Sequence, residues 1–232
     1  MAKQPAKKPK RRFLRRILQG LGLLVLAFTV YIVGGLLFVK IFDPIITGVQ
    51  LQRQIESWGE ETEYERRYEF RDLDEISDHL EHAVIAAEDG RFYEHAGIDQ
   101  EAMREAYEEY QERGRVRGAS TITQQVVKNL FFTTRPNPIR KVLEIPIALL
   151  ADAILSKERI LELYLNIAEW GPGGVFGAEA AAQHHYGIRA DQLGRDASSR
   201  LAAILPSPRK RSPQRMSRYS ATIRTRMQQM GW

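Results

Sequence analysis

The sequence contains no cysteine among its 232 residues. A disulfide framework, a thiol nucleophile and a cysteine-ligated zinc site are therefore excluded. Glycine-rich phosphate loops of the GxxxxGK[ST] and GxGxxG types are also missing, which disfavours a nucleotide cofactor. Neither HExxH nor a paired-histidine spacing occurs, so we predict no dedicated metal site in the chain and no organic cofactor.

Acidic residues are lacking at both ends of the chain. Residues 1–16 and all residues from Pro208 onward carry Lys and Arg but no Asp or Glu. The net charge of +5 therefore comes from the ends, and the residues between them carry more acidic than basic side chains. A basic pI alone would suggest nucleic-acid binding, but the body of the chain is acidic, and we predict no nucleic-acid partner.

Charged residues are absent from Ile17–Val39, a run of 23 residues. About 20 apolar residues in a helix cross the bilayer core. A buried core helix would show a polar face, and a cleaved signal peptide would have a shorter apolar region before a small-residue cleavage site. We therefore predict one transmembrane helix over residues 17–39. The basic residues 1–16 form a cytoplasmic tail by the positive-inside rule, which places the rest of the chain on the opposite side.

The rest of the chain is mostly helical in our prediction, because helical periodicity recurs and strand alternation is missing. Residues 40–70 are expected to form a connector, residues 71–213 the working domain and residues 214–232 a basic C-terminal tail. The tail could contact anionic lipid headgroups or be a disordered end, and the sequence favours neither.

Several helix boundaries can be predicted from capping residues. Ser120 or Thr121 can cap one helix, and Thr121 with Gln124 matches the capping-box form. Asn137 is placed to cap the next helix. Pro146 lies inside that second helix, where we expect a kink or a break.

Two adjacent acids, Glu88 and Asp89, end an apolar stretch in the segment AAEDGRFYEHAGID, residues 86–99. Acids at a helix end are usually solvated. A carboxylate that projects from an apolar helix into a cleft has its pKa raised by desolvation, which suits a general base. Taken alone, the segment fits a solvated turn better than a general base, and we reject a metal nest.

A second candidate surface lies in RGASTITQQVVKN, residues 117–129. On a helix, Thr121, Gln124 or Gln125, and Lys128 fall on one side. Hydroxyl, amide and ammonium groups together suit sugar hydroxyls and phosphate, and the alternative is an ordinary polar helix face.

A second acid, Glu144, follows Arg140 by four residues and has Lys141 beside it. The simplest interpretation is an intrahelical ion pair. Two separated carboxylates with several cations are also the groups that glycosyl chemistry with an anionic leaving group needs. Between the two surfaces, Leu130, Phe131 and Phe132 could enter lipid.

Five patterns occur in order between residues 70 and 213. They are ED-x-x-F-x-x-H-x-G at 88–97, G-x-S-T-I-T-Q-Q-x-x-K-N at 118–129, R-K-x-x-E at 140–144, K-x-x-I-L-E-x-Y-L-N at 157–166, and NIAEWGPGGVFGAEAAAQHHYG at 166–187, with one apparent extra glycine in GPGG. With this order and spacing the chain resembles the peptidoglycan glycosyltransferases of glycosyltransferase family 51, in particular the monofunctional biosynthetic transglycosylases.

The resemblance implies a lysozyme-like helical lobe with a small membrane-contacting jaw, preceded by the single transmembrane helix. It also implies a place in the bacterial inner membrane, with the N-terminus in the cytoplasm and the catalytic domain in the periplasm. The implied partners are the lipid bilayer, lipid II with the growing glycan chain, and other cell-wall synthesis or division proteins.

The activity implied by the resemblance is polymerisation of lipid II into β-1,4-linked glycan strands, with inversion at the MurNAc anomeric carbon and release of undecaprenyl diphosphate. Glu88 would be the catalytic base, and Glu144 would position groups on the diphosphate side or a metal. A divalent cation, Mg²⁺ or Mn²⁺, could assist at the diphosphate. The implied substrate-binding residues are Asp89, Phe92, His95, Ser120, Thr121, Gln124, Gln125, Lys128, Asn129, Arg135, Arg140 and Lys141.

Two other functions stay open on the sequence. A membrane-anchored lytic enzyme could use a similar lobe but would need an acid to protonate a glycosidic oxygen and no dense set of cations. A non-catalytic scaffold for cell-wall assembly could use the polar faces for partners. A transpeptidase is disfavoured, because SSRL lacks the Lys of SxxK and no KTG occurs.

Overall fold

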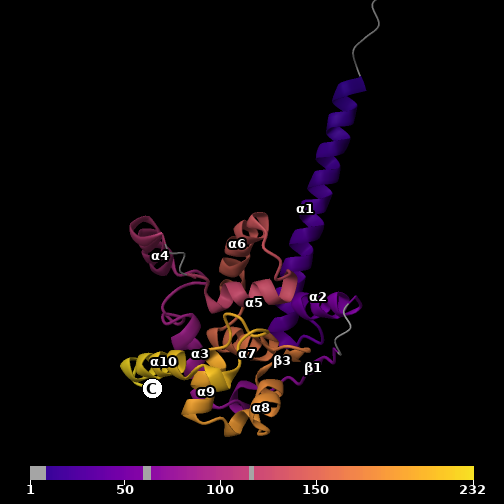
Figure 1. Ribbon diagram of the computed structural model, residues 1–232. Coiled ribbons are helices and arrows are strands. Elements are labelled where there is room, and N and C mark those ends of the chain that lie inside the picture. Colours follow the sequence, from indigo (N-terminus) through magenta and orange to yellow (C-terminus); the bar gives the residue numbers. More distant parts are fainter. Residues whose placement is uncertain (1–8, 60–63, 115–117) are drawn as a thin grey trace, which may run out of the picture. The chain divides into compact units, whose positions relative to one another are not determined.

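The structure is a computed structural model that describes residues 9–59, 64–114 and 118–232, with side chains from Phe13 onward (Figure 1). The chain divides into two compact units, one that ends at Ile41 and one that runs from Phe42 to Trp232. Residues 1–8 of the predicted cytoplasmic tail and residues 60–63 of the predicted connector lie outside the described residues.

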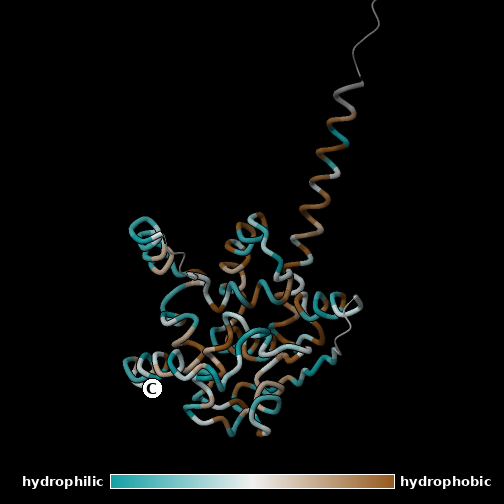
Figure 2. Tube along the Cα trace, viewed as in Figure 1, coloured by the Kyte–Doolittle hydropathy of each residue, from teal (hydrophilic) through white to brown (hydrophobic). Residues whose placement is uncertain are grey.

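The first unit is the helix α1 (Pro9–Ile41). Its 33 residues give a length of about 50 Å, and the stretch Phe13–Ile41 is apolar enough to cross a membrane. The hydrophobic colour along α1 in Figure 2 marks the same stretch. The predicted span over residues 17–39 lies inside this helix, which begins earlier because the basic residues before it are good helix formers.

The second unit is mostly helical, as predicted. Its α-helices are α2 (Gly48–Ser57), α3 (Asp78–Glu88), α4 (Gln100–Arg113), α5 (Ile122–Phe131), α6 (Pro138–Ile154), α7 (Lys157–Ile167), α8 (Ala178–Tyr186), α9 (Arg195–Ala202) and α10 (Ser217–Gln229). Short 3₁₀ turns lie at Leu73–Glu75, Ala190–Gln192 and Pro213–Arg215.

A small sheet that the sequence analysis did not anticipate is formed by β1 (Arg67–Tyr68), β2 (Glu169–Gly171) and β3 (Val175–Phe176). The strand order is β1-β3-β2, with β1 parallel and β2 antiparallel to β3. Strands of two or three residues are too short to show an alternating pattern. The turn before β3 needs the glycine Gly174, at φ +95°, because a Cβ there would lie 2.5 Å from the carbonyl oxygen of Glu65.

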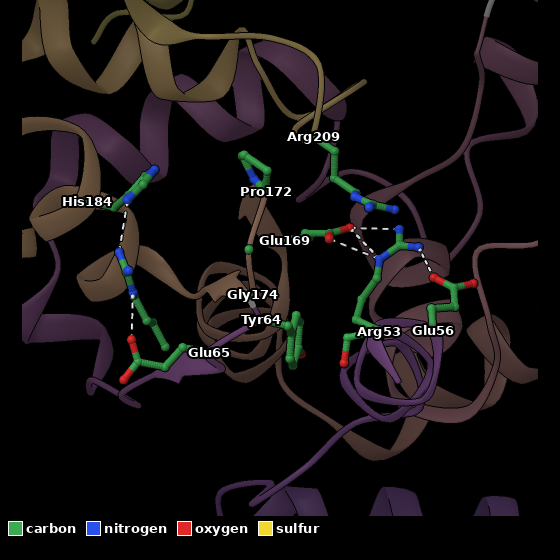
Figure 3. Close-up of a pocket in the computed structure, with 12 residues that line it drawn as sticks. Arg53, Glu56, Tyr64, Glu65, Glu169, Pro172, Gly174, His184 and Arg209 are labelled. Carbon is green, nitrogen blue, oxygen red and sulfur yellow. Dashed lines mark hydrogen bonds and ion pairs between the residues drawn. The ribbon is translucent and has the colours of Figure 1, made fainter. Parts of the chain in front are cut away.

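The helix α2 is fixed to this sheet by a forked ion pair, at one side of a pocket of about 480 Å³ (Figure 3). Arg53 Nε and Nη2 donate to the Glu169 carboxylate at 3.0 and 2.9 Å, and Arg53 Nη1 pairs with Glu56 at 2.8 Å. None of the residues predicted for the functional site lines this pocket.

The predicted caps are present. Thr121 Oγ1 accepts a hydrogen bond from the Gln124 N–H at 3.1 Å, and Gln124 Oε1 accepts one from the Thr121 N–H at 3.1 Å, so Thr121 rather than Ser120 caps α5. Asn137 Oδ1 accepts from the Ile139 N–H at 2.9 Å at the start of α6.

The helix α6 runs through Pro146 without the break that was one of the two predicted outcomes. The proline ring is exposed, while the next two residues, Ile147 and Ala148, are buried. Burial of the residues around a proline can hold a helix together although one backbone hydrogen bond is lost.

The core of the second unit is built around α7. Its apolar side chains and the two large aromatics beside it are almost fully buried; they are Ile160, Leu161, Leu163, Tyr164, Leu165, Ile167, Phe92 and Trp170. The helix α5 packs against α7 on one side and against α6 on the other. Because most of α7 from Ile160 to Ile167 is buried, it provides a rigid support for α5.

The expected C-terminal tail contains a packed helix. Ile223 and Met227 of α10 are fully buried, and α10 packs against α3 and α9 (Figure 1). The Trp232 ring stacks on the His82 ring at 4.3 Å between centroids. The disordered end considered for residues 214–232 is therefore replaced by an element of the domain, because two apolar side chains in a basic segment lie one helical turn apart and share a face.

Candidate active site

A cleft of about 1040 Å³ collects most of the residues predicted for the site. The end of α3, the helices α5 and α6, the loop before α5 and one face of α10 line it. The predicted residues on its walls are Glu88, Asp89, Ser120, Thr121, Gln124, Gln125, Lys128, Arg140, Lys141 and Glu144.

Glu88 is the last residue of α3 and faces the cleft. Gln125 Nε2 donates to Glu88 Oε2 at 2.8 Å, and the hydroxyl of the buried Tyr164 donates to Gln125 Oε1 at 3.2 Å. This chain of hydrogen bonds fixes which end of the Gln125 amide points at the carboxylate.

The pKa of Glu88 is raised from its ordinary value of 4.5 because the side chain is buried. The hydrogen bond from Gln125 and the positive charges of Lys128 and Arg211 act in the opposite direction. A carboxylate that holds a proton more tightly than usual, yet is still stabilised in its charged form by neighbours, is suited to take a proton from a hydroxyl.

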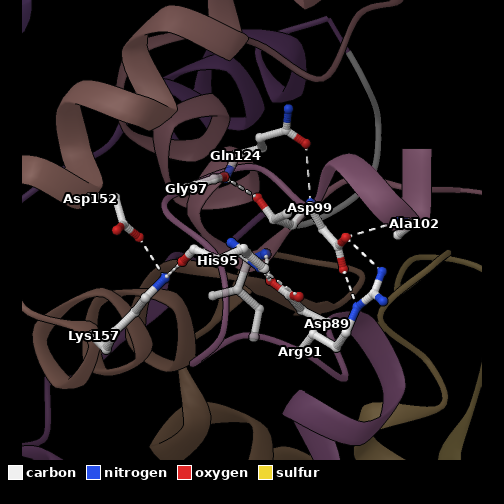
Figure 4. Close-up of polar contacts among 11 residues, drawn as sticks. Asp89, Arg91, His95, Gly97, Asp99, Ala102, Gln124, Asp152 and Lys157 are labelled. Carbon is white, nitrogen blue, oxygen red and sulfur yellow. Dashed lines mark hydrogen bonds and ion pairs between the residues drawn. The ribbon is translucent and has the colours of Figure 1, made fainter. Parts of the chain in front are cut away.

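Asp89, the next residue, holds the start of α5 and lies against His95 (Figure 4). Its Oδ2 accepts a hydrogen bond from the Ile122 N–H at 2.9 Å, and its Oδ1 lies 2.9 Å from His95 Nε2. Thr121 Oγ1 donates to the Gly97 carbonyl oxygen at 2.7 Å. These contacts connect the segment after α3 to the N-terminus of α5, so they set the position of Gln125 and Lys128 relative to Glu88.

The opposite wall carries cations and the second buried acid. Glu144 is only 2 % exposed, and its carboxylate lies 3.2 Å from Arg140 Nη1 and 3.1 Å from Lys141 Nζ. Lys141 also donates to Ser120 Oγ at 2.9 Å, which connects α6 to the loop before α5.

Lys128 is the cation between Glu88 and this wall. In the part of the chain that the structure describes, its ammonium group has no hydrogen-bond or ion-pair partner. Its pKa is lowered by burial and by the charges of Arg140 and Lys141, with Glu144 and Glu88 acting in the opposite direction. A half-buried ammonium group without a partner can bind an anion strongly, since no internal contact has to be broken first.

A group of potential metal ligands lies beside the cleft. Ligand atoms of Asp89, His95 and Asp99 lie within 4.8 Å of one another. Both carboxylates already have partners, however. The Asp99 carboxylate accepts hydrogen bonds from Arg91 Nη2 at 2.7 Å and Arg91 Nε at 3.0 Å, and its Oδ1 caps α4 by accepting from the Ala102 N–H at 2.8 Å. The arrangement therefore works as an internal hydrogen-bond network (Figure 4).

Four predicted residues do not line the cleft. Phe92 is fully buried in the core, with Lys157 Nζ 4.7 Å from its ring centroid. His95 is bound to Asp89, Asn129 is buried, and Arg135 is exposed with Glu56 at 3.7 Å.

The cleft also contains residues that the sequence analysis did not select. Tyr219, Arg226, Gln229 and Met230 of α10 and its C-terminal end contribute to its lining. They belong to the segment predicted as a tail. The spacing of seven residues between Tyr219 and Arg226, with Met230 four further on, places them on one helical face and could have indicated a structured wall.

Comparisons with known proteins find relatives over most of the chain. The model of the transglycosylase family matches residues 53–230. The biosynthetic peptidoglycan transglycosylase of Ectopseudomonas mendocina is 45% identical over 225 residues, which cover 95% of this chain and 91% of that protein. The proteins of the same description from Pseudomonas entomophila and Pseudomonas aeruginosa are 42% and 44% identical, over 94% and 81% of this chain and 94% and 82% of their own lengths.

Proposed function

Because the chain belongs to the transglycosylase family and is a peptidoglycan glycosyltransferase, we propose that it joins lipid II units into β-1,4-linked glycan with inversion at the MurNAc anomeric carbon. The observation that carries this proposal is the pairing, across one cleft, of a carboxylate with a raised pKa and a wall of cations. The leaving group of this reaction is undecaprenyl diphosphate.

In the proposed reaction, Glu88 takes the proton from the 4-hydroxyl of the acceptor GlcNAc. The oxygen of that hydroxyl attacks the anomeric carbon of the MurNAc at the end of the growing chain. A new C–O bond forms as the bond between the anomeric carbon and the diphosphate oxygen breaks, and the diphosphate leaves with the electron pair. The proton stays on Glu88 until it passes to solvent.

The cationic wall serves the leaving group. Lys128, Arg140 and Lys141 surround the position where negative charge grows on the departing diphosphate, and such preorganised charges lower the barrier. A diphosphate leaves without a proton, so no general acid is needed. Glu144 orients Arg140 and Lys141 by pairing with both.

The predicted divalent cation would be held at the same wall. Mg²⁺ is usually bound by one or two carboxylates together with substrate phosphates. Glu144 would supply the protein carboxylate by exchanging its pairing with Arg140 or Lys141 for the ion, and the diphosphate would supply further oxygens. None of the steps above depends on this ion.

The membrane arrangement completes the proposal. With α1 crossing the inner membrane and the basic N-terminal residues in the cytoplasm, the unit from Phe42 to Trp232 would lie in the periplasm, where a lipid-linked substrate is accessible from the membrane surface.

The test is incubation of the purified full chain with labelled lipid II in detergent. We expect long glycan from the native protein and no long glycan from Glu88→Gln, whose coupling rate should be small. Glu81→Gln is the matched control, because Glu81 lies on the same helix with its pKa raised to about 7 by burial but does not line the cleft, and we expect it to polymerise normally. Normal polymerisation by Glu88→Gln would contradict the role of the base. Shortening of preformed glycan without synthesis would instead identify a lytic enzyme.

A further inference from the structure

The cleft wall formed by α10 has no part in the reaction proposed above. Tyr219, Arg226 and Gln229 lie on this wall, and α10 packs against α3, the helix that ends at Glu88. The segment from Pro208 to the C-terminus contains no acid, so no carboxylate of its own neutralises Arg226. We refer to Tyr219, Arg226 and Gln229 as the α10 face.

The α10 face is held in place by the opposite side of the helix. Ile223 and Met227 are buried against the domain. Arg224 Nη1 bonds to Asp196 Oδ1 at 2.7 Å and Ser199 Oγ at 3.0 Å, which fixes α10 on α9. Since the helix is fixed, its backbone has little freedom to lose when a ligand binds to the side chains on its other side.

Arg226 is the charged group of this face. Its side chain is exposed and donates a hydrogen bond from Nη1 to the Ala86 carbonyl oxygen at 3.3 Å, in the helix that carries Glu88. A guanidinium group has five N–H donors in a planar fork, so several donors of Arg226 remain available to the cleft. The fork matches a carboxylate in a bidentate geometry.

The substrate has a part with the matching chemistry. In the proposed reaction, Lys128, Arg140 and Lys141 bind the diphosphate, and the sugars that react lie beside Glu88. The remaining part of lipid II is its peptide, which ends in a carboxylate and offers backbone amides. The Gln229 amide and the Tyr219 hydroxyl can both donate to and accept from such groups.

We propose that the α10 face binds the peptide of the lipid-linked disaccharide, with Arg226 pairing with a peptide carboxylate and Tyr219 and Gln229 bonding to its amides. This inference rests on the proposed function, and it adds the peptide as a part of the substrate that the cleft recognises.

The test measures KM and kcat of the full chain for two substrates, lipid II and the same molecule with its peptide carboxylates converted to amides. Arg226→Ala is expected to raise KM for lipid II by about fivefold, the upper range for a partly exposed ion pair, with kcat changed less than twofold. With the amidated substrate the native protein should already have a KM as high as that of Arg226→Ala for lipid II. Arg226→Ala should not raise this KM further.

The control is Arg218→Ala, which removes an exposed cation from the same helix outside the cleft and should leave both constants unchanged. If Arg226→Ala folds poorly, Gln229→Ala replaces it, because Gln229 is exposed. This variant is expected to raise KM for lipid II by a smaller factor. An equal loss by Arg226→Ala on both substrates, or no change on either, would overturn the proposal. So would a rise in KM that appears only in vesicles of anionic lipid, since that result would make Arg226 a headgroup ligand. Failure of the native protein to make glycan at all would count against the proposed function instead.

Discussion

At the scale of single residues, the two carboxylates of the cleft have opposite surroundings. Glu88 accepts a hydrogen bond from a neutral amide and has its pKa raised by burial. Glu144 lies between two cations, at 3.2 and 3.1 Å. Different surroundings give two similar groups different roles. The first is suited to accept a proton, and the second to hold the positive charges that would meet the diphosphate in the proposed reaction.

Gln125 is the residue through which the basicity of Glu88 can be changed most selectively. Gln125→Leu removes the hydrogen bond that stabilises the charged carboxylate, so the pKa of Glu88 should rise further. The activity of a deprotonated base is lost as pH falls through its pKa. The acid limb of the polymerisation rate should therefore move to higher pH, by about one unit for a hydrogen bond to a charged group.

The matched control for this shift is Gln54→Leu, because Gln54 is exposed on α2 away from the cleft. Its pH profile should coincide with that of the native protein. An unchanged acid limb in Gln125→Leu would show that the amide does not tune the base.

At the scale of elements, α5 carries both the amide that holds Glu88 and the cation Lys128, and its N-terminus is fixed by three contacts. The Asp89 carboxylate accepts from the Ile122 N–H, the Thr121 hydroxyl accepts from the Gln124 N–H, and the same hydroxyl donates to the Gly97 carbonyl. The position of α5 therefore decides the geometry of the reaction, although Asp89 and Thr121 need not contact the sugar.

Thr121→Ala should lower both stability and activity. Loss of the cap costs about 1 kcal/mol of unfolding free energy, and the Gly97 carbonyl is left without its donor. Thr47→Ala is the control, since Thr47 forms the same kind of capping box on α2, outside the cleft. Denaturant unfolding should show a loss in both variants, whereas the rate of glycan synthesis should fall only in Thr121→Ala. Equal rates in the two variants would show that α5 does not need this anchor.

The sequence allowed the helices of the site to be predicted better than the rest of the unit. Capping residues such as Thr121 and Asn137 act on backbone groups next to them in the chain, so their effect can be read locally. The strands β1, β2 and β3 are two or three residues long and exist because distant segments pair, which no local pattern reveals.

Which residues line the cleft also depends on how distant segments pack, so local sequence could not show it. Phe92 and Asn129 lie in motifs with functional residues, yet both are buried outside the cleft lining. Arg226 lies in the segment predicted as a basic tail, and the cleft includes it only because Ile223 and Met227 hold α10 against the domain. Sequence motifs indicated which residues belong together, while the contacts of α10 had to come from the structure.

At the scale of the whole molecule, the chain consists of one apolar helix and one helical unit that contains every residue of the cleft. The absence of cysteine makes the orientation of this arrangement simple to measure, because a single introduced thiol would be the only one in the chain.

A membrane-impermeant maleimide should therefore report the two sides separately. In cells with a permeabilised outer membrane, Gln111→Cys, on the exposed surface of α4, should be labelled without lysis. Ala2→Cys should be labelled only after lysis, because the proposed orientation places the basic N-terminal residues in the cytoplasm. The native chain, which has no cysteine, gives the background level of maleimide labelling. The reverse pattern would contradict the proposed orientation.

The central claim is that Glu88 is the base of the glycosyl transfer, and the most direct test is the pH dependence of lipid II coupling in the native protein and in Glu88→Gln. The native rate should fall on the acid side with a midpoint above 4.5, the ordinary value for a glutamate, because burial raises the pKa of this carboxyl. Glu88→Gln should leave only a small residual rate, on which that acid limb is absent. A residual rate that keeps the same acid limb would contradict the account, because the proton would then be taken by another group.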